Sequence, residues 1–218
     1  MDGEPLSRLT LSEFSQQLAS AEPVPGGGSA SAVVGSFAGS LLAMVARLSL
    51  DRPKYEPYSA TVERAREAGD HARGRFLELA EEDARAYAAF AAARRMPRES
   101  VEETEAREAA SRTAARAATD VPVAVVGECV RLLDDISAMA GRSNLNAASD
   151  LEVAARLVAA AAQGAAANAM INLPMIGDER YAGATRATIR GMLNDIDRTL
   201  ATVSQTINRG GLREPESE

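Results

Sequence analysis

Apolar positions recur at the three- to four-residue spacing of an α-helix along almost the whole chain, and no stretch alternates like a strand. Capping boxes, which pair Ser or Thr with a Glu three residues later, begin helices at Thr10, Ser100 and Ser149. Ser59 is placed to cap another helix. The pattern predicts helices over about residues 11–22, 29–50, 59–95, 100–119, 122–141, 149–174 and 179–208, with a break or kink at Asp120 and Pro122.

The 218 residues show no internal repeat and no domain boundary. They predict one all-α domain of long packed helices, ordered over about residues 9–208, with a flexible tail over 209–218. Alanine supplies much of the apolar content, whereas aromatic residues make up only 4% of the chain. Small side chains bury little area each, so a monomer would have a thin core. We therefore expect a helical oligomer.

Charge and cysteine content exclude several classes of protein. The formal net charge is −7, and no basic stripe with interleaved aromatic residues is present, which argues against nucleic-acid binding. The single cysteine, Cys129, excludes an internal disulfide and a cysteine-rich metal site. The acidic N-terminus is unlike a signal peptide and favours a cytoplasmic protein. Residues 26–46 carry no charge, but their glycines and serines favour a buried helix over a membrane span.

One carboxylate interrupts an apolar helical face. Phe76, Leu79, Tyr87 and Phe90 form a stripe on the helix predicted over 59–95, and Asp83 lies in the middle of it. A carboxylate in apolar surroundings must find partners or shift its pKa upward, and either outcome suits a general acid or base. The alternative is a buried aspartate that bridges to a neighbouring helix.

Asparagines mark the helix predicted over 149–174. Asn168 and Asn172, four residues apart, project toward its apolar side. Their carboxamides offer donors and an acceptor for the edge of a heterocycle, and the alternative is a hydrogen bond between helices. Asn144 and Asp150 lie at the start of the same helix, where Asp150 is also placed to cap it.

A loop with the sequence EPVPGGG leads straight into the apolar helix. It lacks the Gly-Lys-Ser/Thr ending of a nucleotide phosphate loop, and no strand precedes it. Free N–H groups at a helix N-terminus favour an anionic or electron-rich ligand group, and the alternative is a tight corner between helices. Arg52 and Lys54, after the apolar helix, are close enough in sequence to help bind an anion. The only histidine, His71, lies in a charged stretch, which disfavours triad chemistry and metal binding.

Three segments in order, PVPGGGSASA, EEDARAYAAF and NLNAASDLEVAA with NAMINL, resemble the cyclodeaminase domain of formiminotransferase-cyclodeaminase. The same family includes stand-alone methenyltetrahydrofolate cyclohydrolases. The resemblance covers about residues 9–208 and implies an all-helical homodimer with its active site near the subunit interface. It also implies a tetrahydrofolate derivative as substrate, possibly polyglutamylated, with no metal and no other cofactor.

The resemblance further implies two alternative reactions. A cyclohydrolase interconverts 5,10-methenyl- and 10-formyl-tetrahydrofolate, whereas a cyclodeaminase closes 5-formimino-tetrahydrofolate to the methenyl form and releases ammonia. No formiminotransferase half is present in the 218 residues, which tips the expectation toward the cyclohydrolase. The alternative from another class is a non-catalytic helical protein that binds folate or acts as a scaffold.

Matching the family motifs gives each candidate position an expected role. Asp83 is the expected acid or base, and Asp150 is the second catalytic candidate. The expected substrate-binding positions are Gly26, Gly27, Gly28, Ser29, Asn144, Asn168 and Asn172 around the folate, and Arg52 and Lys54 at its glutamate tail. Relatives often carry Gly-Arg-Lys-Lys-Tyr-like residues where this chain has DRPKY, so Asp51 and Pro53 depart from the pattern.

Overall fold

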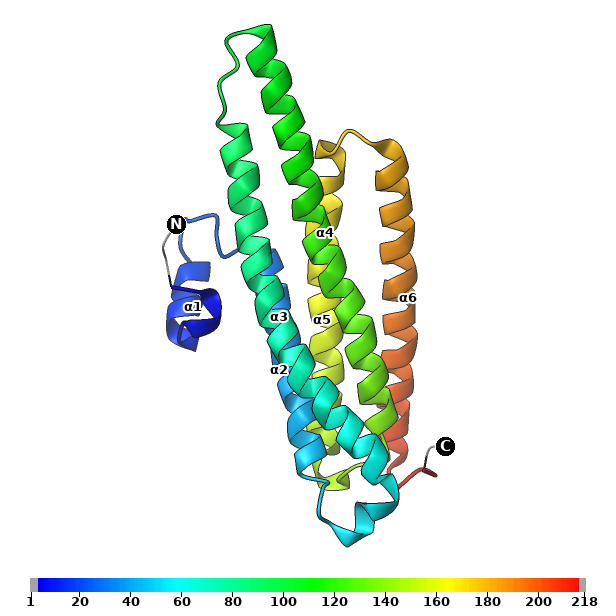
Figure 1. Ribbon diagram of the computed structural model, residues 1–218. Coiled ribbons are helices and arrows are strands. Elements are labelled where there is room, and N and C mark those ends of the chain that lie inside the picture. Colours follow the sequence, from blue (N-terminus) through cyan, green and yellow to red (C-terminus); the bar gives the residue numbers. More distant parts are fainter. Residues whose placement is uncertain (1–3, 216–218) are drawn as a thin grey trace.

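The computed structural model describes residues 4–215 and forms an elongated bundle of helices (Figure 1). The long helices are α2 (Gly27–Arg47), α3 (Ser59–Arg94), α4 (Val101–Met139), α5 (Ala148–Asn172) and α6 (Glu179–Arg209). The short helix α1 (Leu11–Leu18) lies outside the bundle, and the 3-10 segments are η1 (Leu6–Arg8), η2 (Pro53–Tyr58), η3 (Leu145–Ala147) and η4 (Leu173–Met175). Over residues 4–215 there is no strand, which confirms the all-α prediction.

Local capping signals were predicted correctly at two helices and wrongly at two others. Thr10 and Ser100 both form complete capping boxes, at α1 and α4. Ser59 and Ser149 instead lie inside the first turns of α3 and α5, whose N-caps make no side-chain hydrogen bond. In both cases a 3-10 segment runs directly into the α-helix, so the chain already turns before the serine is reached.

Of the break or kink predicted at Asp120 and Pro122, the break is wrong, because α4 continues through both residues. A proline inside a helix leaves the carbonyl four residues earlier without its usual donor. Here that carbonyl belongs to Ala118, and the side-chain Nδ2 of Asn172 on α5 donates to it at 2.9 Å. A neighbouring helix therefore supplies the hydrogen bond that Pro122 removes.

Helix α2 packs against α3 at backbone contact. A Cβ atom built on Gly39 would lie 2.9 Å from the carbonyl oxygen of Gly69, and one on Gly35 would lie 2.7 Å from the ring of Phe76. Helix α2 is long and apolar enough to cross a membrane, with a mean hydropathy of 1.7, but 61% of its most apolar window is buried inside the bundle. Its burial confirms the buried helix that the sequence predicts.

We expect Gly39→Ala to lower the free energy of unfolding by about 1–3 kcal/mol, because the atoms that the new methyl meets are backbone atoms and cannot rotate away. Chemical denaturation measures the change. Gly127→Ala on α4 is the matched control, since nothing lies within 4 Å of its Cβ position, and this variant should gain about 0.5–1 kcal/mol. Equal effects of the two substitutions would contradict the close approach of α2 and α3.

The chain end is held in place at least as far as Glu214, unlike the flexible tail predicted over 209–218. The backbone N–H of Arg213 donates to the Gly141 carbonyl at 2.7 Å, and the Tyr58 hydroxyl donates to the Arg213 carbonyl at 2.7 Å. Arg142 Nε reaches the Glu214 carbonyl at 2.8 Å. These partners come from distant parts of the sequence, so a local pattern cannot reveal them. Residues 216–218 lie outside the described residues.

Candidate functional site

A cleft of about 340 Å³ opens where α2 begins, between α3, α4 and α5. Its lining includes six of the residues predicted from the sequence: Gly26, Gly27, Gly28, Asp83, Asn168 and Asn172. These residues come from three segments far apart in the chain, and the antiparallel packing of the long helices brings them together. The glycine loop, the stripe aspartate and the asparagine pair therefore form one site.

The Asp83 carboxylate lies against the first turn of α2. Its Oδ2 accepts a hydrogen bond from the Ser29 hydroxyl at 2.8 Å, and Ser29 itself is fully buried. Burial raises the pKa of Asp83 above its ordinary value, although the hydroxyl and the backbone amide of Ser29 act in the opposite direction. A carboxyl group with a raised pKa at a cleft wall is suited to take up and return a proton.

Gly28 is what allows this carboxylate to approach the helix end. A Cβ atom at residue 28 would lie 2.2 Å from Asp83 Oδ1, closer than any real contact. Gly26 is the N-cap and offers no side chain, so the first N–H groups of α2 have no side-chain cap. The positive end of the α2 dipole thus faces the side of the cleft that holds Asp83.

The two asparagines of the cleft differ in the hydrogen bonds that they form within the protein. Asn168 Nδ2 donates to the Gly164 carbonyl of its own helix at 2.9 Å, and this nitrogen lies 3.1 Å from the Cβ position of Gly27. Within the described structure its Oδ1 accepts no hydrogen bond, so it is available to a ligand. Asn172 makes the interhelical bond to Ala118 described above, which agrees with the structural alternative for this residue.

The remaining candidates lie at the other end of the bundle. Asp150 is in the first turn of α5, and the 18 residues from it to Asn168 span about 27 Å of helix axis. Asn144 is buried, donates to the Leu48 carbonyl at 3.2 Å and caps η3. Arg52 and Lys54 flank the start of η2, with the Lys54 ammonium 5.6 Å from the Tyr55 ring centre.

One chain therefore does not assemble all of the predicted positions into a single site. Within one chain the length of α2 separates Arg52 and Lys54 from the glycine loop, and their predicted role in binding an anion stays a prediction. Asn144 is likewise engaged in holding the chain between α4 and α5.

An apolar wall of the cleft was only half predicted. Tyr87, Phe90, Ile171 and Met175 line it, and the sequence placed the first two on the buried stripe of α3. Tyr87 is in fact 42% exposed and Ile171 is 73% exposed. The stripe is uncovered here because α2 begins only at Gly27, beside Asp83, and α3 continues past it (Figure 1). The signal in the sequence for this wall was that the apolar stripe of α3 is longer than α2, the helix that covers it.

Within residues 4–215, no group of three or more His, Cys, Asp or Glu side chains is arranged to hold a metal ion.

Comparison with known proteins places these features in a family. The family model described as formiminotransferase-cyclodeaminase matches residues 10–191. A methenyltetrahydrofolate cyclohydrolase from Methylorubrum extorquens is 30% identical over 91% of this chain and 98% of that protein. A formimidoyltransferase-cyclodeaminase from Sus scrofa is 29% identical over 88% of this chain, which spans only 36% of that longer protein.

A solved structure has the same fold. It is a formiminotetrahydrofolate cyclodeaminase from Thermotoga maritima, with a TM-score of 0.84 and 29% identity over 94% of this chain and 98% of that chain. The matched region includes the glycine loop, Asp83 and both asparagines. The chain belongs to the formiminotransferase-cyclodeaminase family.

Proposed function

We propose that this protein is a folate one-carbon enzyme that acts at the carbon between N5 and N10 of tetrahydrofolate, with methenyltetrahydrofolate cyclohydrolase as its main activity. The observation that carries the proposal is the position of Asp83, a carboxyl group with a raised pKa on the wall of a cleft lined by amide and apolar groups. The full-length match to a stand-alone cyclohydrolase supports the choice of reaction.

In the hydrolytic direction, water attacks the cationic methenyl carbon and the Asp83 carboxylate accepts one proton from it. A neutral tetrahedral carbon bearing a hydroxyl group forms between the two nitrogens. When this intermediate collapses, the bond to N5 breaks, protonated Asp83 supplies the proton to N5, and the hydroxyl proton is released. The products are 10-formyl-tetrahydrofolate and one proton. The ionised carboxylate also attracts the cationic substrate before the reaction.

The cyclodeaminase reaction is the second candidate, favoured by the likeness to the Thermotoga maritima enzyme. There N10 attacks the carbon of the protonated formimino group, Asp83 takes the proton from N10 and returns it to the amino group on that carbon, and ammonia leaves as the methenyl cation forms. Both reactions pass through the same tetrahedral carbon and need a single proton carrier. Neither needs a bound metal or a cofactor other than the folate itself.

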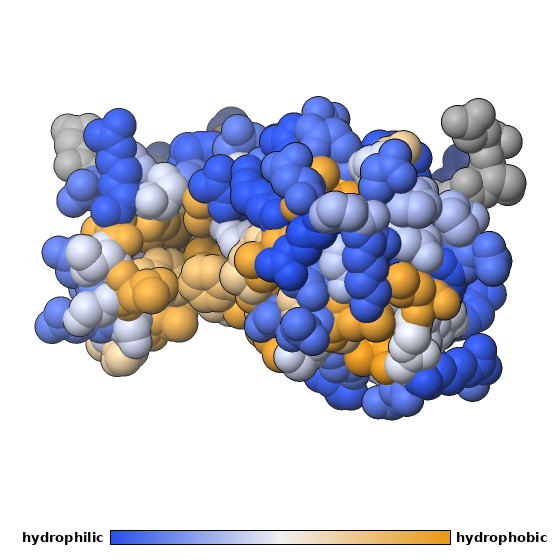
Figure 2. Space-filling view, turned by 90° about the horizontal axis from the view of Figure 1, so that it is seen from below, coloured by the Kyte–Doolittle hydropathy of each residue, from blue (hydrophilic) through white to orange (hydrophobic). Residues whose placement is uncertain are grey.

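We also propose that the enzyme works as a cytoplasmic homodimer. Large apolar side chains on α1, on α2 and at the C-cap of α2 remain exposed: Leu11, Leu18, Phe37, Met44 and Leu48. Figure 2 shows apolar surface in the hollow between the α1 side and the bundle. An apolar surface of this kind is typical of a protein interface. Light scattering on the purified chain tests the proposal, and the mass of a monomer would contradict it.

The enzymatic proposal is tested by following the near-ultraviolet absorbance of 5,10-methenyl-tetrahydrofolate with the purified protein. Loss of absorbance well above the rate in buffer supports the cyclohydrolase, and ammonia release from 5-formimino-tetrahydrofolate supports the cyclodeaminase. If both are absent, calorimetric titration with folate separates the non-catalytic alternatives. Binding without turnover then identifies a carrier, and no binding identifies a scaffold.

We expect Ser29→Ala to shift the acidic limb of the pH profile of kcat/KM upward by about 1 pH unit. The Ser29 hydroxyl stabilises the ionised Asp83, so its removal raises the pKa of Asp83 further. Since the attack step uses the ionised carboxylate, activity is then lost at a higher pH as the solution is acidified. Ser40→Ala, whose hydroxyl bonds only to the Ser36 carbonyl, is the control. An unchanged acidic limb in Ser29→Ala would mean that Asp83 is not the group whose titration produces that limb.

A further inference from the structure

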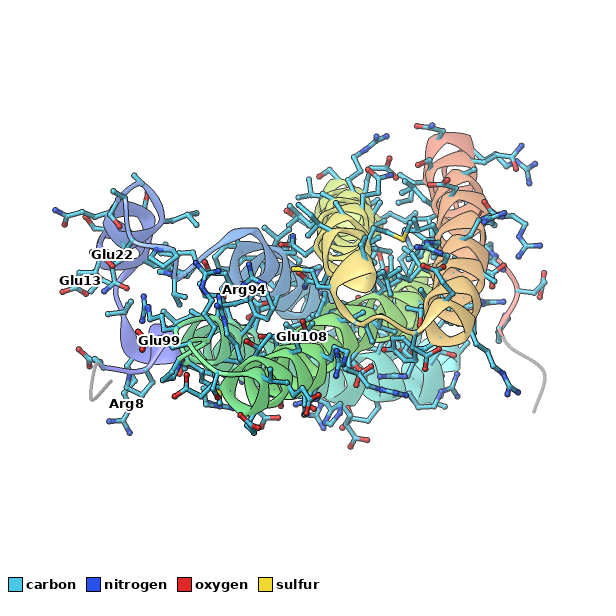
Figure 3. The ribbon with its side chains drawn as sticks, turned by 90° about the horizontal axis from the view of Figure 1, so that it is seen from above. Arg8, Glu13, Glu22, Arg94, Glu99 and Glu108 are labelled. Carbon is cyan, nitrogen blue, oxygen red and sulfur yellow. The ribbon has the colours of Figure 1, made fainter. Side chains whose placement is uncertain are left out.

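Two hydrogen-bond acceptors from different helices lie over the first turn of α2. Figure 3, which looks down the bundle, shows α2 (blue) beside α5 (yellow), with α3 and α4 on one side of them. Asp83 comes from α3, and the Cβ position of Gly28 lies 2.2 Å from its Oδ1. Asn168 comes from α5, and the Cβ position of Gly27 lies 3.6 Å from its Oδ1. Two consecutive glycines therefore leave room for two polar side chains at the same cleft.

The orientation of the Asn168 amide is set by its own helix. Its Nδ2 donates to the Gly164 carbonyl at 2.9 Å, and a carbonyl can only accept, so the nitrogen must be the atom on that side. The Oδ1 is the end of the amide that is left for the cleft, and in the described part of the chain it accepts no hydrogen bond. Asn172, one turn further along α5, directs its amide to a carbonyl of α4 instead. Asn168 therefore offers the cleft a fixed acceptor near Asp83.

An acceptor at this place needs a donor, and the substrate has none there. The inference rests on the proposed function, which puts the carbon between N5 and N10 at Asp83. In 5,10-methenyl-tetrahydrofolate each of these nitrogens is bonded to three carbon atoms and carries no hydrogen. The N–H groups of the pterin lie on the far side of the ring system. The water that attacks the methenyl carbon does have hydrogens to donate, and it has one for each of the two acceptors.

We propose that Asn168 positions the attacking water. One O–H group of the water donates to Asn168 Oδ1, and the other donates to the Asp83 carboxylate. Two fixed acceptors orient the water so that an oxygen lone pair is directed at the methenyl carbon. As the C–O bond forms, the electron pair of the C=N bond moves to nitrogen and neutralises the cation, and one proton passes to Asp83. The hydroxyl group on the tetrahedral carbon keeps its hydrogen bond to Asn168, which accepts no proton itself.

The same pair of acceptors suits the cyclodeaminase reaction. The amino group on the tetrahedral carbon occupies the place of the hydroxyl group. It donates a hydrogen bond to Asn168 Oδ1 while it receives the proton from Asp83, and it then leaves as ammonia. Asn168 therefore acts in whichever of the two reactions the protein catalyses.

The test is Asn168→Leu, which keeps the approximate size of the side chain and removes the acceptor. We expect kcat to fall by about 10–100-fold, while KM stays within about twofold of the wild-type value. The Gly164 carbonyl keeps its helical N–H donor, and leucine is favoured over asparagine inside a helix, so the melting temperature should not fall. Asn168→Ala should give the same result, which excludes an effect of the leucine side chain itself. Gln163→Ala, at an exposed position of α5 outside the cleft, is the matched control and should keep both constants.

A double-variant cycle shows whether Asp83 and Asn168 act on the same water. Asp83→Asn combined with Asn168→Leu should be only slightly slower than Asp83→Asn alone, because a water that cannot pass its proton on gains little from being held in place. Residues that act on different groups would instead give effects that multiply. Multiplied effects in the double variant would overturn the inference.

Other outcomes also overturn it. A higher KM with unchanged kcat would mean that Asn168 binds an edge of the substrate, and unchanged kcat and KM would leave it no part in the reaction. A lower melting temperature of both variants with unchanged kcat would mean that Asn168 only stabilises the fold. Failure of the proposed function is seen in the wild-type protein instead. If that protein turns over neither 5,10-methenyl- nor 5-formimino-tetrahydrofolate, the enzymatic proposal is contradicted, and the role of Asn168 is lost with it.

Discussion

Asp83→Asn is expected to lower kcat by about 10²–10⁴-fold while the protein stays folded and keeps its melting temperature or gains a little. The amide can still accept the Ser29 hydrogen bond, but it cannot carry a proton. Burial raises the pKa of Asp83 in the folded protein, so the folded state loses stability as the pH rises through that pKa and the carboxylate ionises. A neutral amide removes this cost at neutral pH. Absorbance assays and thermal unfolding, done on the same samples, measure the two effects.

The opposite directions of the two effects distinguish a catalytic group from a structural one. If Asp83 merely bridged α3 to α2, its substitution would destabilise the protein and leave much of the activity. Asp197→Asn, at an exposed position of α6, is the matched control and should change neither quantity. If Asp83→Asn is fully active, the chemistry belongs elsewhere, and Asp150 is the next residue to substitute.

The helices could be predicted because their signals are local. The predicted span 59–95 differs by one residue from α3 as observed, and the boxes at Thr10 and Ser100 form as the pattern indicates. Periodicity, caps and prolines act within a few residues of the chain, so the sequence contains them directly. The glycines and serines of residues 26–46 likewise indicated the buried helix that is observed as α2.

Contacts between distant segments explain the errors. Pro122 alone predicts a break, and only the arrival of Asn172 from α5 shows why α4 continues. The tail is held by Tyr58 and Gly141, each more than 70 residues from Arg213. A pattern of one segment carries no information about a donor that another segment brings.

At the candidate site, too, the local features could be predicted and the contacts between distant segments could not. Asp83 was visible as a polar residue on an apolar stripe, and its neighbourhood with the glycine loop followed from family motifs. What the sequence could not reveal is that α2 begins beside Asp83 and leaves the upper part of α3 uncovered. That difference in length leaves the apolar wall of the cleft uncovered. Asp150 and Lys54 lie at the far end of the bundle, because the two ends of each long helix are about 30 Å or more apart.

Gly28→Ala is expected to lower kcat/KM by about 100-fold with little change in stability. The new methyl group would lie 2.2 Å from Asp83 Oδ1, so the carboxylate must rotate away from the first turn of α2. Rotation of a side-chain end is cheap, and alanine is favoured over glycine inside a helix by about 1 kcal/mol, so the fold tolerates the change. The rate falls because the proton carrier no longer faces the reacting carbon.

Gly74→Ala separates this effect from a general effect of adding a methyl group to a helix. Gly74 lies on α3, as Asp83 does, and nothing lies within 4 Å of its Cβ position. The control variant should therefore be slightly more stable and fully active, whereas Gly28→Ala should be folded and nearly inactive. A Gly28→Ala protein with wild-type kcat/KM would mean that Asp83 does not need its place against the α2 N-terminus, and the acid–base role argued from that geometry would be lost.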